Sequence, residues 1–207
     1  KSGSVNDKRI DKVGQMVPET AQVRIRPRKG RVFVSRGGEK LDYALEQTNT
    51  EVENLVCLDL GASTGGFTDC LLRRGARTVY AVDVGYGLLD WRLRTDARVV
   101  NLERTHAAKL TDEHLRESID FACADLSFTS LENVIPSVTW ALAPNAMGVF
   151  LVKPQFEAAQ HEIGAGGIVT DPSVHQRVCA KSKAFLEALG FADLTLVTSP
   201  IKGAKGN

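Results

Sequence analysis

The chain has 207 residues, 43% of them hydrophobic and 25% charged, and a formal net charge of +1. This composition is typical of a soluble globular protein with one hydrophobic core and a small appendage. It excludes a membrane-spanning protein, because no run approaches the roughly 18 apolar residues that a transmembrane helix needs. We expect a cytoplasmic protein without a secretory leader.

The cysteines lack the C-x-x-C spacing of a zinc or redox site. Cys57 and Cys123 lie within apolar runs that predict buried strands. We therefore expect the cysteines to be reduced and buried small side chains, neither disulfide partners nor metal ligands. The four cysteines are Cys57, Cys70, Cys123 and Cys179.

Residues 1–31 are too few to enclose a core. They contain short β-like pieces interrupted by Gly14 and Pro18, and they end in a segment of linker composition over 26–31. We expect residues 1–31 to be the remainder of a domain whose beginning is absent, and residues 32–207 to form a second domain.

Basic residues are concentrated between residues 7 and 40, although the chain as a whole is nearly neutral. This asymmetry suggests a polyanionic partner, although a solvated basic surface would produce the same pattern. The basic residues are Lys8, Arg9, Lys12, Arg24, Arg26, Arg28, Lys29, Arg31, Arg36 and Lys40, and the acidic residues are Asp7, Asp11, Glu19 and Glu39.

Residues 35–41, with the sequence SRGGEKL, predict a glycine hinge that opens a helix through Leu45. Lys40 falls in the first turn of that helix, where the helix dipole disfavours a cation. Either Lys40 is simply solvated at this position, or it has a partner in a functional site.

Residues 55–83 contain the most informative pattern of the chain. The apolar run 55–60 predicts a strand that leads into the small-residue turn 61–66 and a helix, and 78–82 predicts the next strand. Such a turn lets the backbone approach a nucleoside, and Asp83 at the second strand tip can accept hydrogen bonds from ribose hydroxyls. A glycine turn alone can also serve only to pack a helix on a strand.

The same turn differs from the Gly-x-Gly-x-x-Gly pattern of dinucleotide-binding proteins, because its first two glycines are Gly61 and Gly65. Asp59 precedes the turn by two residues and would repel a pyrophosphate, whereas it would tolerate an uncharged or cationic adenosyl ligand. The pattern therefore favours S-adenosylmethionine over a dinucleotide.

Strands and helices continue to alternate with short connections in the rest of the chain. Further strands are predicted at 99–100, 119–124, 148–152 and 193–198, and helices at 110–116, 131–142 and 172–189. The alternation predicts an α/β protein with a Rossmann-like, doubly wound and mainly parallel sheet that carries helices on both faces.

Charged residues follow two of these strands. Asp125 comes directly after 119–124, and Lys153 comes directly after 148–152. Ligands of such sheets bind outside the carboxyl ends of the strands, so both side chains should lie beside the nucleoside site. Each could be only a solvated strand end, but two opposite charges at this place favour chemistry.

The residues at this edge of the sheet indicate which chemical group accepts the methyl. Methylation of a base amino group commonly uses an Asn/Asp-Pro-Pro-aromatic turn, whereas residues 125–128 are Asp-Leu-Ser-Phe, and no cysteine follows a proline as carbon methylation would require. A hydroxyl acceptor needs a base, and a lysine with a depressed pKa can serve. We therefore expect Lys153 to act on a hydroxyl, with Asp125 orienting it and Lys40 raising the local positive potential.

Five ordered motifs resemble those of the haemolysin A (TlyA) family, whose members are relatives of the FtsJ/RrmJ 2′-O-methyltransferases. They are SRGGEKL at 35–41, LDLGASTGGFTD at 58–69, AVDVG at 81–85, DLSF at 125–128 and LVKPQFE at 151–157. The resemblance covers the chain from about Val5 to its end. It implies a class I methyltransferase that uses S-adenosylmethionine to methylate ribose 2′-hydroxyls of ribosomal RNA, with cytidines as the expected acceptors.

The family's Lys-Asp-Lys-Glu catalytic set corresponds to Lys40, Asp125 and Lys153. Its glutamate belongs to a Gly-Asn-x-Glu motif, of which Gly206 and Asn207 are present, so we expect the fourth member just beyond the end of this chain. No metal is expected, because the leaving group is already activated by its positive charge. The expected cofactor contacts are Asp59, Gly61, Ala62, Ser63, Thr64, Gly65, Gly66, Phe67, Asp83, Val84 and Asp125.

The front piece resembles the last part of an S4-type RNA-binding domain, with strands at 5–6 and 13–17. Two other classes stay open: an RNA-binding assembly factor that keeps the fold without the chemistry, and a secreted cytolysin. A dehydrogenase is disfavoured, because none of Tyr43, Tyr80 or Tyr86 is followed four residues later by a lysine.

Overall fold

The computed structural model describes the backbone of residues 2–5, 8–10, 23–26 and 33–203, and the side chains of 33–203. The chain divides into two compact units, residues 1–32 and 33–207. In the first unit, β1 (Ser2–Val5) pairs antiparallel with β2 (Lys8–Ile10) and with β3 (Val23–Arg26). The strand expected at 5–6 overlaps the end of β1, whereas Asn6 and residues 13–17 lie outside the described residues.

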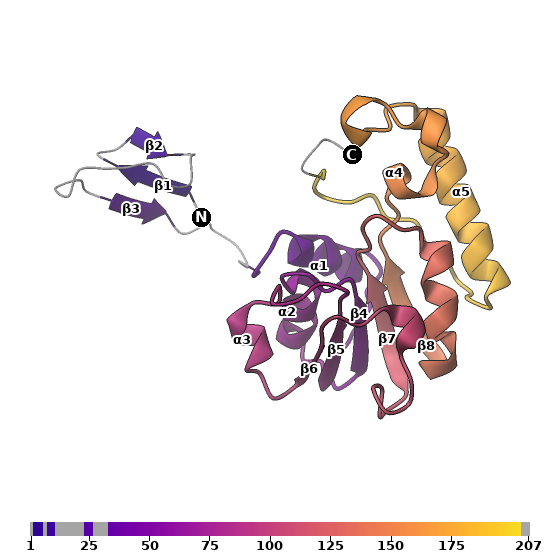
Figure 1. The fold of residues 1–207 in the computed structure, drawn as a ribbon, viewed down its shortest axis with the longest axis horizontal. Coiled ribbons are helices and arrows are strands. Elements are labelled where there is room, and N and C mark those ends of the chain that lie inside the picture. Colours follow the sequence, from indigo (N-terminus) through magenta and orange to yellow (C-terminus); the bar gives the residue numbers. More distant parts are fainter. Residues whose placement is uncertain (1, 6–7, 11–22, 27–32, 204–207) are drawn as a thin grey trace. The chain divides into compact units, whose positions relative to one another are not determined.

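The second unit is built on a five-stranded sheet in the order β6-β5-β4-β7-β8, in which all neighbouring strands run parallel (Figure 1). The strands are β4 (Val56–Leu60), β5 (Thr78–Val82), β6 (Val99–Leu102), β7 (Ile119–Ala124) and β8 (Leu142–Phe150). The α-helices are α1 (Gly37–Gln47), α2 (Gly66–Arg73), α3 (Trp91–Arg94), α4 (Pro154–Glu157) and α5 (Pro172–Ala188). The 3₁₀ helices are η1 (Ala107–Lys109), η2 (Leu131–Asn133), η3 (Ile135–Ala141), η4 (Gln160–Glu162) and η5 (Ala165–Gly167).

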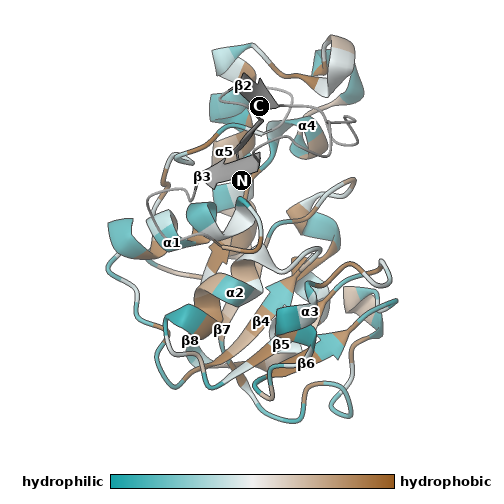
Figure 2. Ribbon diagram, turned by 90° about the vertical axis from the view of Figure 1, so that its left-hand side faces the viewer, coloured by the Kyte–Doolittle hydropathy of each residue, from teal (hydrophilic) through white to brown (hydrophobic). Residues whose placement is uncertain are grey.

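The central strands are mainly apolar because both faces of the sheet are covered, with Asp59 in β4 and Asp120 in β7 as exceptions. Successive side chains of a strand point to opposite faces. Cys57 of β4 accordingly packs in one core with Leu41 of α1, while Leu58 packs in a second core with Val138 of η3 and Leu186 of α5. In Figure 2, hydrophobic colour covers much of the central strands, and hydrophilic colour is more frequent on the helices and loops. The predicted doubly wound parallel sheet is confirmed.

Two of the predicted helices are wrong. Residues 110–116 form no helix, because the buried Leu110 and Leu115 are five apart, a spacing that one helical face does not provide. The segment 131–142 forms η2 and η3 in place of an α-helix, since Pro136 lacks the amide hydrogen that a continuous helix needs. The expected helix at 172–189 agrees with α5.

Two predicted strands also differ from the structure. The strand expected at 148–152 is instead β8, which begins at Leu142 and ends at Phe150 because its extent follows its pairing with β7. Residues 193–198 form no strand, since they pair with no strand among the described residues. The alternation there reflects packing of Leu194 against the core, while Leu196 is 71% exposed.

The structure agrees with the expected absence of disulfides and, for three of the four cysteines, with the expected burial. All four cysteines are free, and three are buried, whereas Cys179 is only half-buried. Burial raises the pKa of the Cys57 and Cys70 thiols to about 12, so neither is a reactive thiolate near neutral pH. Within the described residues, no helix combines the length and apolar character that crossing a membrane requires.

Candidate active site

The carboxyl ends of four neighbouring strands lie in one row across the sheet. The last paired residues of these strands are Val82, Leu60, Ala124 and Phe150. The residues that follow them continue the pairing through backbone hydrogen bonds, from Gly61 N to Val82 O at 2.9 Å, from Asp125 N to Leu60 O at 3.1 Å and from Leu151 N to Ala124 O at 2.9 Å. The first residues after the strands are therefore brought to one edge, as the sequence predicted for Asp83 and Asp125.

Gly61 permits the close approach of β4 and β7 at the point where the strand order reverses. Its φ is +78°, and a Cβ at this position would lie 3.0 Å from the carbonyl oxygen of Asp125. A residue with a side chain would be strained here and would push the two strand ends apart. The glycine turn therefore lies directly against Asp125.

The Asp83 carboxylate is held at the tip of β5 by two backbone amides. Ser63 N donates to Oδ2 at 2.8 Å, and Gly85 N donates to Oδ1 at 2.7 Å. The neighbouring Val84 side chain is 68% exposed. An oriented carboxylate beside an exposed apolar side chain fits the ribose and base of an adenosyl group.

Asp59 is fully buried beneath the turn. Thr68 donates to its Oδ2 through the backbone nitrogen at 2.9 Å and through the hydroxyl at 2.7 Å, whereas Oδ1 has no hydrogen-bond partner among the described residues. Burial raises the pKa of Asp59 to about 7, the Thr68 hydrogen bonds oppose this rise, and the negative charges of Asp125 and Asp83 add to it. A buried oxygen without a partner fits a cationic ligand group, as S-adenosylmethionine would supply.

Replacement of Asp59 by asparagine is expected to stabilise the cofactor-free protein at pH 8. The folded protein holds a proton on Asp59 that the unfolded chain loses near pH 4, so this group makes stability fall as the pH rises from about 4 to about 7. We expect the midpoint temperature of the asparagine variant to exceed that of the parent by roughly 3–8 °C at pH 8 and to approach it at pH 5. Calorimetric scans at both values test this, and a lower midpoint at pH 8 would contradict it.

Asp125 lies between two lysines that come from distant parts of the chain. Lys40 Nζ is 3.1 Å from Asp125 Oδ2, and Lys153 Nζ is 2.7 Å from Asp125 Oδ1. The three side chains are only 18% to 19% exposed. Lys40, a cation near the start of α1, therefore has Asp125 as its partner. All three expected catalytic residues meet at the strand tips.

Lys40 is positioned because α1 is fixed against α2. Arg74, at the end of α2, bonds the Asp42 carboxylate of α1 through Nε at 2.8 Å and the Asp42 carbonyl through Nη2 at 3.0 Å. At the other end of the contact, a Cβ on Gly66 would lie 2.8 Å from Gly38 N. The helices therefore meet closely at the glycine turn, which brings Lys40 to the site.

Ser127 and Phe128, which follow Asp125 in the chain, make contacts that the sequence did not predict. Lys153 Nζ donates to Ser127 Oγ at 3.0 Å. Phe128 has a φ of +64° and is 92% exposed, and its ring centroid is 5.5 Å from that of Phe156. Local sequence predicts a role for the aspartate of the motif at 125–128, but it predicts neither of these two contacts.

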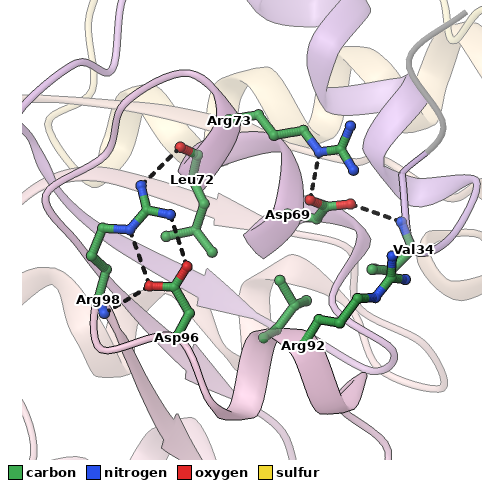
Figure 3. A pocket seen from close by; sticks show the side chains of 8 residues that line it. Val34, Asp69, Leu72, Arg73, Arg92, Asp96 and Arg98 are labelled. Atoms are coloured by element: carbon green, nitrogen blue, oxygen red, sulfur yellow. Dashed lines mark hydrogen bonds and ion pairs between the residues drawn. The ribbon is translucent and has the colours of Figure 1, made fainter.

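A pocket of about 260 Å³ lies elsewhere, between Val34, α2 and α3 (Figure 3). Its three arginines are all paired, Arg73 with Asp69 at 2.6 Å, Arg92 with Asp90 at 3.0 Å and Arg98 with Asp96 at 2.8 Å. Asp69 also accepts the Val34 amide at 2.8 Å. None of the expected site residues lines this pocket. Asp69 and Arg73 already serve to attach the segment before α1, so we do not assign the cofactor to this pocket.

The sequence model of the FtsJ-like methyltransferases matches residues 33–207. The chain belongs to the FtsJ-like methyltransferase family. The predicted resemblance to the haemolysin A (TlyA) group is confirmed by relatives of this FtsJ-like methyltransferase. The 16S/23S rRNA (cytidine-2′-O)-methyltransferase TlyA of Mycobacterium tuberculosis is 44% identical over 92% of this chain and 71% of its own length. Hemolysin A of Brachyspira hyodysenteriae is 42% identical over 84% of this chain and 73% of its own.

Solved structures agree with this assignment. A hemolysin-like protein of Streptococcus thermophilus superimposes on the FtsJ-like methyltransferase with a TM-score of 0.85 at 41% identity, covering 98% of this chain and 73% of the other. A hemolysin-like protein of Lactococcus lactis has a TM-score of 0.81 at 42% identity, with 84% of each chain covered.

Proposed function

We propose that this FtsJ-like methyltransferase uses S-adenosylmethionine to methylate ribose 2′-hydroxyls of ribosomal RNA, with cytidines as the expected acceptors. The observation that carries the proposal is the Lys40–Asp125–Lys153 cluster, whose aspartate directly adjoins Gly61 of the glycine turn. The name of the Mycobacterium tuberculosis relative, a 16S/23S rRNA (cytidine-2′-O)-methyltransferase, supports the same substrate.

The cofactor would be held around the tips of β4 and β5. Asp83 would accept hydrogen bonds from the ribose hydroxyls, Val84 would face the adenine, and Asp59 would compensate positive charge. When bound, S-adenosylmethionine supplies a methyl group on a positively charged sulfur. The turn 61–66, with Phe67 behind it, contributes small residues that let the backbone approach such a ligand.

Lys153 would remove or hold the proton of the acceptor 2′-hydroxyl. Its amine lies at the strand tips, only partly exposed, beside the Asp125 carboxylate that compensates its charge in the resting protein. Lys40 forms an ion pair with the other oxygen of the same carboxylate. This second ion pair keeps Asp125 in place if Lys153 moves. This arrangement holds the base in place for general base catalysis.

The basic front part of the chain would contribute affinity for RNA phosphates. Its strands β1, β2 and β3 belong to a separate unit, and β2 and β3 carry Lys8, Arg9, Arg24 and Arg26. We propose that this unit is an S4-like RNA-binding piece, as the sequence suggested. Binding through such residues should weaken with salt, because it releases counterions from the RNA.

Mass spectrometry of nucleosides tests the proposed function. Unmethylated ribosomal subunits are incubated with the protein and S-adenosylmethionine, and their RNA is digested and analysed for 2′-O-methylcytidine. We expect this nucleoside to appear only with both protein and cofactor. Binding of subunits without methylation would support an assembly factor, and cofactor-independent leakage of lipid vesicles would support a cytolysin.

A further inference from the structure

Lys153 makes three different kinds of contact at the strand tips. Its Nζ forms an ion pair with Asp125 Oδ1 at 2.7 Å, lies 5.7 Å from the ring centroid of Phe156, and donates a hydrogen bond to Ser127 Oγ at 3.0 Å. Ion pairs and cation–π contacts depend mainly on distance, whereas a hydrogen bond also requires alignment of the N–H with its acceptor. Ser127 therefore contributes the directional contact of this amine.

The orientation of the amine matters because a neutral amine accepts a proton only through its single lone pair, which points in one direction. Besides the bond to Cε, the nitrogen of a neutral lysine has two N–H bonds and one lone pair. The negative charge of Asp125 beside the amine repels the lone pair from its own side, which leaves the other two positions open. The Ser127 hydroxyl accepts one N–H, which removes one of these two positions and leaves the lone pair in the last one.

Ser127 is held firmly enough to act in this way. Asp125, two residues before Ser127, is fixed to the sheet by the hydrogen bond from its amide to the Leu60 carbonyl. The carbonyl oxygen of Asp125 also lies close to Gly61, because a Cβ added to Gly61 would be only 3.0 Å from it. The residue after it, Phe128, stacks at an angle on Phe156. Both ends of the short turn are thus attached to the elements that carry Gly61 and Lys153.

We infer that Ser127 is a positioning residue for Lys153, which directs the lone pair of the amine toward the acceptor ribose hydroxyl. The inference rests on the proposed function. During transfer the 2′-hydroxyl proton moves to Lys153, the oxygen forms a bond to the methyl carbon, and the bond from that carbon to the sulfonium sulfur breaks with its electron pair left on sulfur. Ser127 exchanges no proton in this step.

A purely structural role for this hydroxyl is disfavoured by its exposure. Ser127 is exposed, and a hydrogen bond in contact with water adds little to the stability of a fold. Removing the hydroxyl should therefore leave the midpoint temperature unchanged. An effect on turnover would then report on the geometry of the amine.

The test compares three variants of the protein on ribosomal subunits with labelled S-adenosylmethionine. Ser127→Ala should lower kcat about tenfold while the KM for subunits and the Kd of the cofactor stay within about twofold of the parent. Ser127→Thr keeps the hydroxyl and should restore kcat to within about threefold of the parent. Ser130→Ala is the matched control, because the Ser130 side chain makes no capping bond where η2 begins, and it should match the parent.

The outcomes separate this inference from the proposed function. Absence of methylation by the parent protein would refute the proposed function and this inference with it. A methylating parent with an equally fast Ser127→Ala variant would refute the inference alone. The inference would also fail if alanine changed KM instead of kcat, or if threonine at an unchanged midpoint temperature were as slow as alanine.

Discussion

Replacement of Lys153 by alanine is expected to abolish methyl transfer while S-adenosylmethionine binding persists. A positioned general base contributes roughly 10²–10⁴-fold to a rate, and the loss of its charge adds to this effect, so we expect turnover to fall at least about 1,000-fold. Asp125 keeps its ion pair with Lys40, so the carboxylate is not left without a cation. Single-turnover methylation of ribosomal subunits and calorimetry of cofactor binding measure the two quantities.

Lys181→Ala provides the matched control for this prediction. Lys181 also forms an ion pair, with Glu132 at 3.0 Å, but on α5 and with a 54% exposed side chain. Lys153→Arg separates the two possible roles of the amine, because arginine keeps the positive charge and stays protonated. An inactive arginine variant supports a base, and an active one supports electrostatic stabilisation. Retained turnover in Lys153→Ala would remove this lysine from the mechanism.

Loss of the Asp83 carboxylate should weaken S-adenosylmethionine binding about 100-fold or more. We expect two losses in the free energy of cofactor binding, each of about 1.5–3 kcal/mol, the usual contribution of hydrogen bonds to a charged group. The cofactor loses its acceptor for the ribose hydroxyls, and the turn loses the group that holds the Ser63 and Gly85 amides. Titration calorimetry of Asp83→Ala measures this loss directly.

Turnover of the Asp83→Ala variant should approach that of the parent when the cofactor is saturating, because Asp83 does not contact the lysine cluster. The exposed Asp112 offers a control, and Asp112→Ala should bind the cofactor as the parent does. An unchanged affinity in Asp83→Ala would mean that the cofactor does not lie across the tips of β4 and β5.

Local sequence was sufficient for the elements whose pattern is strong. The strands at 56–60 and 78–82 follow from short apolar runs, and α5 follows from a long periodic segment after Pro172. Local sequence was insufficient where pairing with a neighbouring strand decides whether a strand forms and how long it is. Residues 193–198 alternate like a strand but have no described partner, and β8 extends over residues 142–150 because β7 determines its length.

The candidate site divides in the same way. The chain order alone indicates that Asp83, Asp125 and Lys153 follow strands, because apolar runs that end in a charged residue are local features. The meeting of Lys40 with Asp125, 85 residues apart, depends on the strand order and on the packing of α1 against α2. The contact of Ser127 with Lys153 likewise exists only in the folded chain. Short-range periodicity encodes the elements, whereas contacts between them arise only when register and packing select one arrangement, which for this protein places one carboxylate between two lysines.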